Sequence, residues 1–361
     1  MFKISIKGKN ESSDEFIKLM FIENANRAGI NLKINDDLTM EEVEKKGITN
    51  LPAINVNGVI KSKENEDIID FFRVVNSLIL KERDYGTMKK IIVPIDFSDN
   101  SLNALEYAKA IAKSFNGVIM LISVFDNSVS MIEEMNFSSH ELIKNHKKQL
   151  DDLRNELNLS FAKDDWHSPL IESEFKVGNV ADCIMQYAEE NENSMIVMGS
   201  RGETDLLDKI FGTISTAVAE KSKVPVLIIP PNVSFKQVNH LVYCSNDIGL
   251  DKDQMLNVVD VVKRCKPHIH LLHIDNENRY YKAMELLDLL KPNYLPGMVS
   301  YDLVFGDDKE KALSDYCNNK SIDMIALSKK DRGFFERLFH KSFAKEIIQN
   351  LKLPLMVVHG Q

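Results

Sequence analysis

Short apolar runs alternate with amphipathic segments through the middle of the chain. The run at residues 91–96 is apolar enough to be buried on both faces, which is typical of a strand in a parallel sheet, and the segments between the runs carry apolar residues at helical spacing. The expected strands span residues 91–96, 118–124, 170–177 and 194–198, and the expected helices span 100–115, 130–158 and 179–190. This alternation predicts a doubly wound α/β sheet, in which ligands bind beyond the carboxyl ends of the strands.

The last third of the chain repeats this pattern. Its apolar runs follow the same order as those of the middle third, and they span residues 240–244, 269–274, 299–305, 322–327 and 353–358. A repeat of this length predicts a second copy of the same domain.

The first part of the chain predicts a different order, β-α-β-α-β-β-α. Its expected strands include residues 2–6 and 30–34, and its expected helices include 39–46 and 66–81. The pair Asn57-Gly58 after an apolar run indicates a hairpin. Together the patterns predict three domains, at residues 1–86, 87–233 and 234–361.

Composition excludes several classes of protein. The chain has 361 residues and a formal net charge of −9, which disfavours a nucleic-acid partner held by phosphate contacts. No apolar run approaches the roughly 20 residues of a membrane span, and the first residues lack the apolar segment of a secretion signal. We therefore expect a cytoplasmic protein without a membrane or nucleic-acid partner.

The cysteines and histidines do not predict a metal or redox site. The four cysteines, none of which forms a CxxC pair, are Cys183, Cys244, Cys265 and Cys317, and we expect reduced thiols. His268 and His270 share one face of an expected strand, whereas His273 falls on the other. This alternation disfavours a metal site with these three ligands.

A glycine-rich stretch follows the last strand of the middle segment. The run Val197-Met-Gly-Ser-Arg-Gly202 ends that strand, and Gly212-Thr-Ile-Ser215 opens an expected helix. Glycines let the backbone approach a ligand closely, and the free N–H groups at a helix start attract an anion. The stretch indicates phosphate binding, with a tight turn and a simple helix cap as the alternative.

These residues resemble the universal stress protein family in its nucleotide-binding branch. The resemblance rests on the spacing G-x2-G-x9-G-S/T, on Ile91-Ile-Val-Pro-Ile-Asp-Phe-Ser98 before it and on Val224-Pro-Val-Leu-Ile-Ile229 after it, and it covers residues 88–231. It implies a doubly wound, adenine-nucleotide α-hydrolase-like domain that binds ATP, or ADP or AMP, together with Mg2+ or Mn2+.

The resemblance also implies roles for single residues. It places Asp96 near the ribose, the phosphates and a divalent cation, which prefers oxygen ligands; a turn or capping aspartate is the alternative. The nucleotide-binding residues that it implies are Pro94, Ile95, Asp96, Val124, Met198, Gly199, Ser200, Arg201, Gly202, Gly212, Thr213, Ile214 and Ser215. No Walker A sequence and no catalytic constellation accompany them.

The last third departs from this motif while keeping its outline. By sequence, Tyr243-Cys244-Ser245 takes the place of Pro-Ile-Asp. Leu327-Ser-Lys-Lys330 takes the place of Gly-Ser-Arg-Gly, and His340-Lys341 takes the place of the Gly-Thr pair. Side chains then occupy positions where bare backbone must approach a phosphate, which predicts a degenerate copy. Its basic residues, which could hold another anion but suit a solvated surface better, are Lys329, Lys330, Arg332, Arg337 and Lys341.

Domains of this family commonly pair through their last strands. Here those strands are residues 226–229 and 355–358, both apolar. Pairing them inside one chain would cover two sheet edges; pairing between chains in a homodimer is the alternative.

The first 86 residues resemble a thioredoxin-like domain. Pro52, before an apolar strand, matches that family's cis-proline. The loop after the first strand contains no cysteine, so we expect the fold without thiol–disulfide exchange. Ser12 or Ser13 in that loop is expected to cap the first helix. The domain would serve as a docking module for an unknown protein.

The leading hypothesis is therefore an adenine-nucleotide-binding universal stress protein that acts in a stress response or in signalling through protein contacts. The alternatives are an interaction scaffold that binds no nucleotide and a slow ATPase. The absence of catalytic groups favours a protein that is not an enzyme, with slow hydrolysis as the most that is expected.

Overall fold

The computed structural model forms two compact units, which are described separately. One unit contains residues 1–86 and 158–170, and the other contains residues 87–157 and 171–361. The residues that the structure describes are 2–7, 18, 32–35, 38–45, 53–56, 59–62, 90–115, 117–126, 138–164, 169–191, 194–201, 212–244, 258, 261–262, 267–274, 298–306, 308–329 and 350–358.

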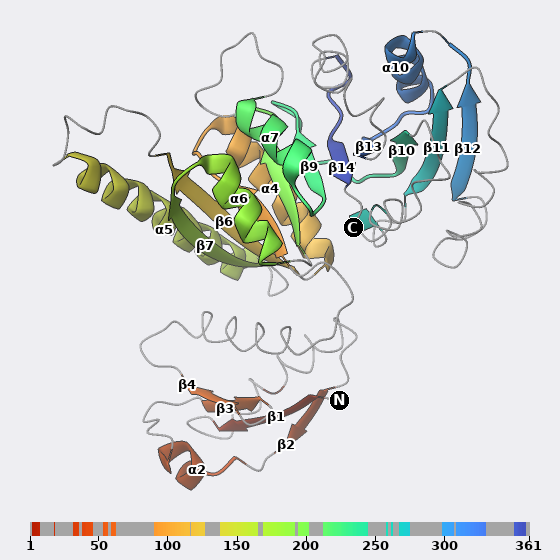
Figure 1. The fold of residues 1–361 in the computed structure, drawn as a ribbon. Helices are drawn as coiled ribbons and strands as arrows, with labels where there is room; N and C mark the ends of the chain where they lie inside the picture. The colour runs from red at the N-terminus through yellow and green to blue at the C-terminus, as the bar shows by residue number, and fades with distance from the viewer. Residues whose placement is uncertain are drawn as a thin grey trace. The chain divides into compact units, whose positions relative to one another are not determined.

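The first unit contains a four-stranded sheet (Figure 1). Its elements are β1 (Phe2–Lys7), β2 (Leu32–Asn35), α2 (Met40–Lys45), β3 (Ala53–Val56) and β4 (Val59–Ser62). The strand order is β2-β1-β3-β4, with β1 and β2 parallel and the other pairs antiparallel. The expected hairpin is confirmed, because β3 and β4 pair with Val56 opposite Val59. Ser12, Ser13, Pro52 and the expected helix 66–81 lie outside the described residues.

Helix α2 begins with a reciprocal cap. The backbone N–H of Glu42 donates to Thr39 Oγ1 over 3.3 Å, and the N–H of Thr39 donates to Glu42 Oε2 over 3.0 Å. This capping box supplies acceptors for donors that a helix start leaves without partners. The helix buries Val43 against Leu38 and Ala53.

The second unit is built on one ten-stranded sheet, which we divide into two halves. The first half comprises β5 (Lys90–Pro94), α4 (Asp99–Phe115), β6 (Val118–Phe125), α5 (Ser138–Asp164), β7 (Leu170–Val177), α6 (Val180–Glu189), β8 (Ser194–Gly199), α7 (Thr213–Lys221) and β9 (Val226–Ile229). Residues 158–164 of α5 and residue 170 of β7 belong to the first unit. The second half comprises β10 (His240–Cys244), β11 (His268–Ile274), β12 (Val299–Val304), α10 (Lys309–Asn319), β13 (Met324–Ser328) and β14 (Leu355–Val358).

The two halves have the same strand order. The first half runs β9-β8-β5-β6-β7 and the second β14-β13-β10-β11-β12. Neighbouring strands within each half are parallel in every pairing with a described register. The registers also agree, because Lys90 at the start of β5 pairs with Val118 of β6, and His240 at the start of β10 pairs with His268 of β11.

The halves join through their last strands. β14 pairs with β9 in antiparallel orientation, with Leu355 opposite Ile228 and Val357 opposite Val226. Of the two alternatives that the sequence left open, the structure therefore contains the pairing within one chain. Both strands are fully buried, so the pairing covers two apolar edges that would otherwise be open to other chains.

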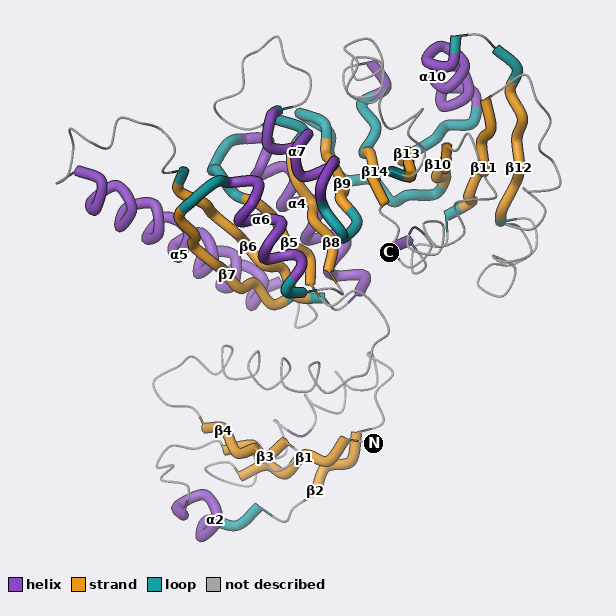
Figure 2. The backbone as a smooth tube through the Cα atoms, in the orientation of Figure 1, coloured by secondary structure: helices purple, strands orange, loops and turns teal. Residues whose placement is uncertain are grey.

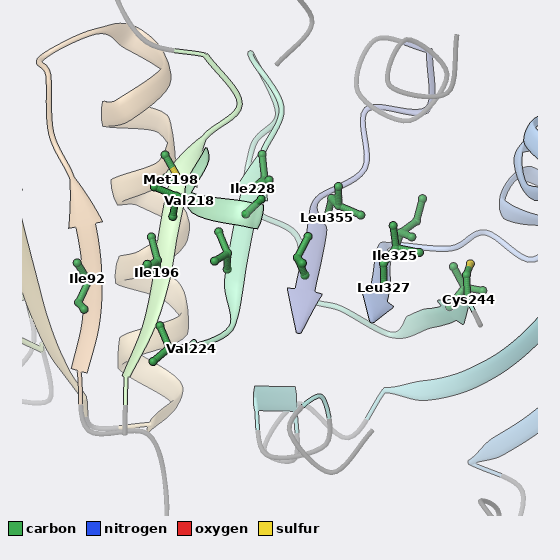
Figure 3. Close-up of a cluster of buried hydrophobic side chains, with 14 of the residues drawn as sticks. Ile92, Ile196, Met198, Val218, Val224, Ile228, Cys244, Ile325, Leu327 and Leu355 are labelled. Atoms are coloured by element: carbon green, nitrogen blue, oxygen red, sulfur yellow. The ribbon is translucent and has the colours of Figure 1, made fainter. Parts of the chain in front are cut away.

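One apolar core runs through this junction. Helices α6 and α7 cover one face of the first half, and α4 lies on the other (Figures 1 and 2). Figure 3 shows side chains of β5, β8 and β9, among them Ile196 and Ile228, continuing into Leu355 of β14 and Ile325 of β13. Because burial of apolar area is the main stabilising contribution in folding, this continuity predicts that the two halves stabilise each other.

Helix α5 is the longest described helix, and most of its described positions are polar. Among the described residues, no helix is both long enough and apolar enough to cross a membrane.

Candidate functional site

The candidate site lies where the strand order of the first half reverses. From β5 the chain continues to β6 and β7 on one side, and then returns to β8 and β9 on the other. The carboxyl ends of β5 and β8 therefore diverge into loops on opposite faces, which is where doubly wound sheets bind their ligands. Strand β5 ends at Pro94, so Ile95 and Asp96 lie in the loop just beyond it.

Gly199 ends β8 against the start of helix α4. A Cβ atom at this position would lie 3.0 Å from the carbonyl oxygen of Asn100 and 3.1 Å from its carbonyl carbon. The atoms that exclude a side chain here are mainly backbone atoms of a helix. A Cβ atom here would force the start of α4 to move by a few tenths of an ångström, so the close approach of α4 to β8 favours glycine, whatever ligand the site takes.

The backbone of Ser200 connects three elements. Its N–H donates to the carbonyl oxygen of Ile229 at the end of β9 over 2.9 Å, and its own carbonyl accepts from the N–H of Gly212 over 2.8 Å. The hydroxyl of Ser215 donates to the same carbonyl over 2.8 Å and lies 3.0 Å from the carbonyl of Gly212. These bonds place the start of α7 beside the end of β8.

Among the described residues, no side chain caps the start of α7. Its N-cap residue is Gly212, with φ −70° and ψ 158°. Thr213 is exposed, and Ile214 packs against the core. A helix start without a capping side chain presents N–H donors and a partial positive charge, which suits an anion.

The residue whose carbonyl bonds to this helix start, Ser200, also has a buried side-chain hydroxyl. Ser200 is fully buried, and its Oγ has no hydrogen-bond partner in the described part of the chain. Buried polar atoms are nearly always hydrogen-bonded, so an exception requires an explanation. A ligand group at the start of α7 would supply one.

Asp96 forms the turn between β5 and α4. Its Oδ1 accepts from the N–H of Ser98 over 3.1 Å and from the hydroxyl of Ser98 over 2.6 Å. Ser98 in turn accepts from the N–H of Ser101, so Ser98 caps α4 and Asp99 is already its first helical residue. Phe97, which lies between Asp96 and Ser98, has a positive φ of 63°. One carboxylate oxygen thus shapes the turn, which is the structural alternative that the sequence allowed.

A buried serine and a histidine support the loop after β5. The hydroxyl of Ser123 donates to the carbonyl of Ile95 over 2.8 Å and lies 3.0 Å from Nε2 of His146 on α5. Since the single hydroxyl proton goes to Ile95, Nε2 of His146 carries the proton that forms the second bond. Ser123 directly precedes Val124, so this network joins two positions expected on the adenine side. Neither Ser123 nor His146 belongs to the nucleotide motif, and the one signal in the sequence is a polar serine inside an apolar run.

Aromatic rings surround His146. The ring centroids of Phe97, Phe125 and Phe175 lie 5.3, 6.3 and 5.9 Å from that of the imidazole. The histidine therefore connects α5 with the ends of three segments of the sheet.

Replacing Ser123 by alanine should lower the free energy of unfolding by about 1–3 kcal/mol, because the carbonyl of Ile95 and the imidazole of His146 both lose a partner. Urea denaturation followed by circular dichroism measures this. The matched control is Ser194→Ala, since Ser194 is also buried but its Oγ has no partner among the described residues. Equal effects of the two substitutions would contradict the role of Ser123.

The structure places the remaining implied residues as follows. Met198 is buried in the core on β8, Arg201 is half-buried beyond it, and Val124 is half-buried near the carboxyl end of β6. Gly202 lies outside the described residues. No three His, Cys, Asp or Glu side chains lie together as metal ligands within the described part of the chain.

The corresponding positions of the second half carry side chains. Ser200 and Lys329 correspond, because their N–H groups bond to Ile229 and Val358, the last residues of the paired strands. Ser328 therefore stands at the position of Gly199, and the shared register of β5 and β10 puts Cys244 at the position of Pro94.

The sequence alignment of the two halves is thus wrong by one residue, because it matched Gly199 with Leu327 and Pro94 with Tyr243. Strand pairing, which apolar runs do not encode, decides the match. Of the residues that the sequence singled out in the second half, those outside the described ranges are Ser245, Lys330, Arg332, Arg337, His340 and Lys341.

Comparison with known proteins identifies the family. The model of the universal stress protein family matches residues 87–230. Universal stress protein MJ0531 of Methanocaldococcus jannaschii is 31% identical over 163 residues, which are 44% of this chain and 90% of that protein. Universal stress protein YxiE of Bacillus subtilis is 30% identical over 148 residues, 39% of this chain and 97% of that protein.

A longer likeness is seen among solved structures. A universal stress protein from Archaeoglobus fulgidus resembles 76% of this chain and 97% of its own, with a TM-score of 0.57 and 19% identity. This likeness concerns the fold alone. With the family match and the two relatives, it leads to one conclusion: the chain belongs to the universal stress protein family.

Proposed function

We propose that the first half of the sheet binds an adenine nucleotide, with its phosphates at the start of α7 and its base against the ends of β5 and β6. The protein would use this site in a stress response or in signalling, through contacts with other proteins. The observation that carries the proposal is the helix start at Gly212, which no side chain in the described part of the chain caps and which lies at the reversal of strand order.

The residues around this helix start suit a phosphate. The N–H groups of the first turn of α7 and the hydroxyl of Thr213 are donors, and Arg201 adds a cation on the adjoining loop. The buried hydroxyl of Ser200 supplies a further polar group. Mg2+ or Mn2+ would be bound mainly by the nucleotide phosphates, with Asp96 near it, since hard cations prefer such oxygens.

Nothing among these groups is arranged as a base for attack by water. We therefore propose binding with slow hydrolysis at most. A scaffold without nucleotide is the competing proposal, and mass spectrometry of the denatured, freshly purified protein distinguishes the two, because a nucleotide-binding protein is expected to retain some adenine nucleotide.

We also propose that the second half of the sheet is a degenerate copy of the first. Its equal strand order and register support this, and Ser328 and Lys329 occupy the positions where the first copy has Gly199 and Ser200. Such a copy would serve as a structural partner through β14. The four-stranded N-terminal unit would be a thioredoxin-like docking domain without redox cysteines.

ATP with Mg2+ should raise the melting temperature of the full chain. At about 100 times the dissociation constant a ligand adds about 2.7 kcal/mol, which corresponds to roughly 5–11 °C for a unit of this size. Differential scanning fluorimetry with a titration of Mg-ATP measures the shift. An unchanged melting temperature in millimolar Mg-ATP would count against nucleotide binding.

Two variants test the position of the phosphates. Gly212→Val is compatible with the backbone, because φ and ψ lie in the extended region, but it puts a branched side chain at the helix start and should weaken ATP binding at least about tenfold. Ser200→Ala removes a hydroxyl without a partner, so it should leave the unliganded stability within about 0.5 kcal/mol while lowering affinity. Wild-type affinity in both variants would exclude this site.

A further inference from the structure

A cluster of polar side chains lies at the amino-terminal ends of β10 and β11, away from the carboxyl-end loops. His240 begins β10, and His268 and His270 lie on the same face of β11. The parallel register sets His240 beside His268 and Val242 beside His270. The histidine cluster, as we call it, consists of His240, His268, His270, Ser300, Asp302 and Tyr316, from β10, β11, β12 and α10.

Asp302 determines which atoms of the cluster donate. Its Oδ2 accepts the hydroxyl of Tyr316 over 2.8 Å and that of Ser300 over 3.0 Å. Each hydroxyl has one proton, which it donates to Asp302. The hydroxyl oxygens of Tyr316 and Ser300 can therefore only accept hydrogen bonds from the imidazoles. His270 Nδ1, 3.0 Å from the oxygen of Tyr316, and His268 Nε2, 3.1 Å from that of Ser300, therefore each carry a proton.

The contact between His240 and His270 limits how many protons the cluster holds. Nδ1 of His240 lies 3.1 Å from Nε2 of His270. In neutral His270 the proton is on Nδ1, so Nε2 is bare and accepts from His240. One added proton is accommodated if His240 moves its proton to Nε2. A second makes both rings imidazolium cations, with two N–H groups facing each other across this contact.

Burial and neighbouring charges oppose protonation as well. The side chain of His270 is 6% exposed. Its pKa is lowered to about 4, mainly by this burial and next by His268, while Asp302 acts in the opposite direction. Burial likewise lowers the pKa of His268. His240 and Lys320 add positive charge, Lys320 Nζ lying 4.0 Å from Asp302 Oδ1.

Two further groups face the cluster. The carboxylate of Asp323 accepts the backbone N–H of His240 over 2.9 Å. Burial and the hydrogen bond to Asp302 raise the pKa of Tyr316, so its hydroxyl keeps its proton.

We propose that the histidine cluster is a proton-binding site that makes the second half of the sheet acid-labile. Neutral histidines join β10, β11, β12 and α10 through the bonds described. When His240 and His270 are both protonated, two N–H groups face each other and the hydrogen bond between these rings is lost. Since His270 has a lower pKa in the folded chain than the ordinary 6.5, the unfolded state binds more protons between about pH 4 and 6.5. The stabilisation is complete above pH 6.5 and is lost as the pH falls through this range.

The first half of the sheet is an internal control. In the same register Lys90, Val118 and Met120 occupy the positions of His240, His268 and His270. Lys90 Nζ donates to the hydroxyl of Tyr187 over 3.3 Å. This bond stands where the second half has the histidines and Tyr316. No histidine occupies the three positions, so the acid response that this cluster causes should be confined to the second half.

The titration of His270 tests the site directly. In the full chain, NMR of labelled imidazoles between pH 7.5 and 4, with His270 assigned by its loss in His270→Gln, should give a pKa near 4. That is roughly 300-fold weaker proton binding than an ordinary histidine. A pKa between 6 and 7 would overturn the proposal.

Hydrogen–deuterium exchange tests the structural consequence. Between pH 7.5 and 5, after correction for intrinsic exchange rates, β10–β12 should lose roughly 30-fold in protection through His270 alone, and β5–β7 should lose less than about threefold. His270→Gln, which keeps a donor and an acceptor without a titrating ring, should abolish most of the loss. The matched variant Lys90→Met removes a polar contact but no histidine and should leave the loss unchanged. Equal losses in both halves, or an unchanged loss in His270→Gln, would refute the proposal.

Discussion

Gly199→Val should lower the melting temperature of the unliganded protein by roughly 6–12 °C. The new Cβ would lie 3.0 Å from the carbonyl oxygen of Asn100, and the neighbouring atoms belong mainly to the backbone of α4. Helix α4 cannot yield easily, since it buries Ala104, Leu105 and Ala108 beneath the sheet. Overpacking of this kind costs typically about 1–3 kcal/mol, and about 3 kcal/mol corresponds to that shift for a unit of this size.

This result bears on how the glycine motif is tested. Loss of nucleotide binding in Gly199→Val would follow from distortion of β8 and α4 and would say little about phosphate contacts. Gly212→Val is the matched control, because its backbone conformation admits any residue and it should lower the unliganded melting temperature by no more than about 4 °C. If Gly199→Val melted like the wild type, the close approach of α4 to β8 in the structure would be incorrect.

Leu355→Ala should lower the free energy of unfolding by about 2–5 kcal/mol, the usual range for truncating a fully buried leucine. Leu355 is buried on β14 directly opposite Ile228 of β9, and both belong to the core that continues across the junction of the two halves. Ile228→Ala should have a similar effect. Because opposite residues of an antiparallel pair share one face, the two substitutions should be coupled by about 0.5–3 kcal/mol.

Urea denaturation of the two single variants and the double variant measures this coupling. Leu142→Ala is the control for the chemical change itself, since Leu142 is 53% exposed on α5 and its truncation should cost less than about 0.5 kcal/mol. Additive effects of Leu355→Ala and Ile228→Ala would contradict the pairing of β9 with β14 in solution. Coupled effects would show that the two halves of the sheet stabilise each other.

Several features could be predicted from local sequence because they depend on periodicity. Apolar runs marked β5, β6 and β8 to within a few residues, and the Asn-Gly pair marked the hairpin of β3 and β4. The spacing of Gly199 and Gly212 also indicated a strand that ends at the first glycine and a helix that begins after the second, and the structure contains both. Each of these signals arises within one element or one turn, so no distant contact is needed to detect it.

Other features depend on which distant segments meet. The network of Ser123 and His146 joins β6 to α5, and the histidine cluster joins four elements across 77 residues of sequence, from His240 to Tyr316. His268 and His270 could be placed on one face from alternation alone, but the addition of His240 required the register of β10 with β11. The same register corrected the alignment of the two halves by one residue.

By itself, the sequence determined the alternation of strands and helices, the family and the place of the glycine loop, because burial on both faces and turn chemistry are local properties. Only the tertiary structure decided that β9 pairs with β14, that the close approach of α4 favours glycine at Gly199 and that three histidines share one network. The physical reason is that strand register and helix approach depend on packing between residues far apart in the chain, and a shift of one residue along a strand reverses the face on which every side chain lies.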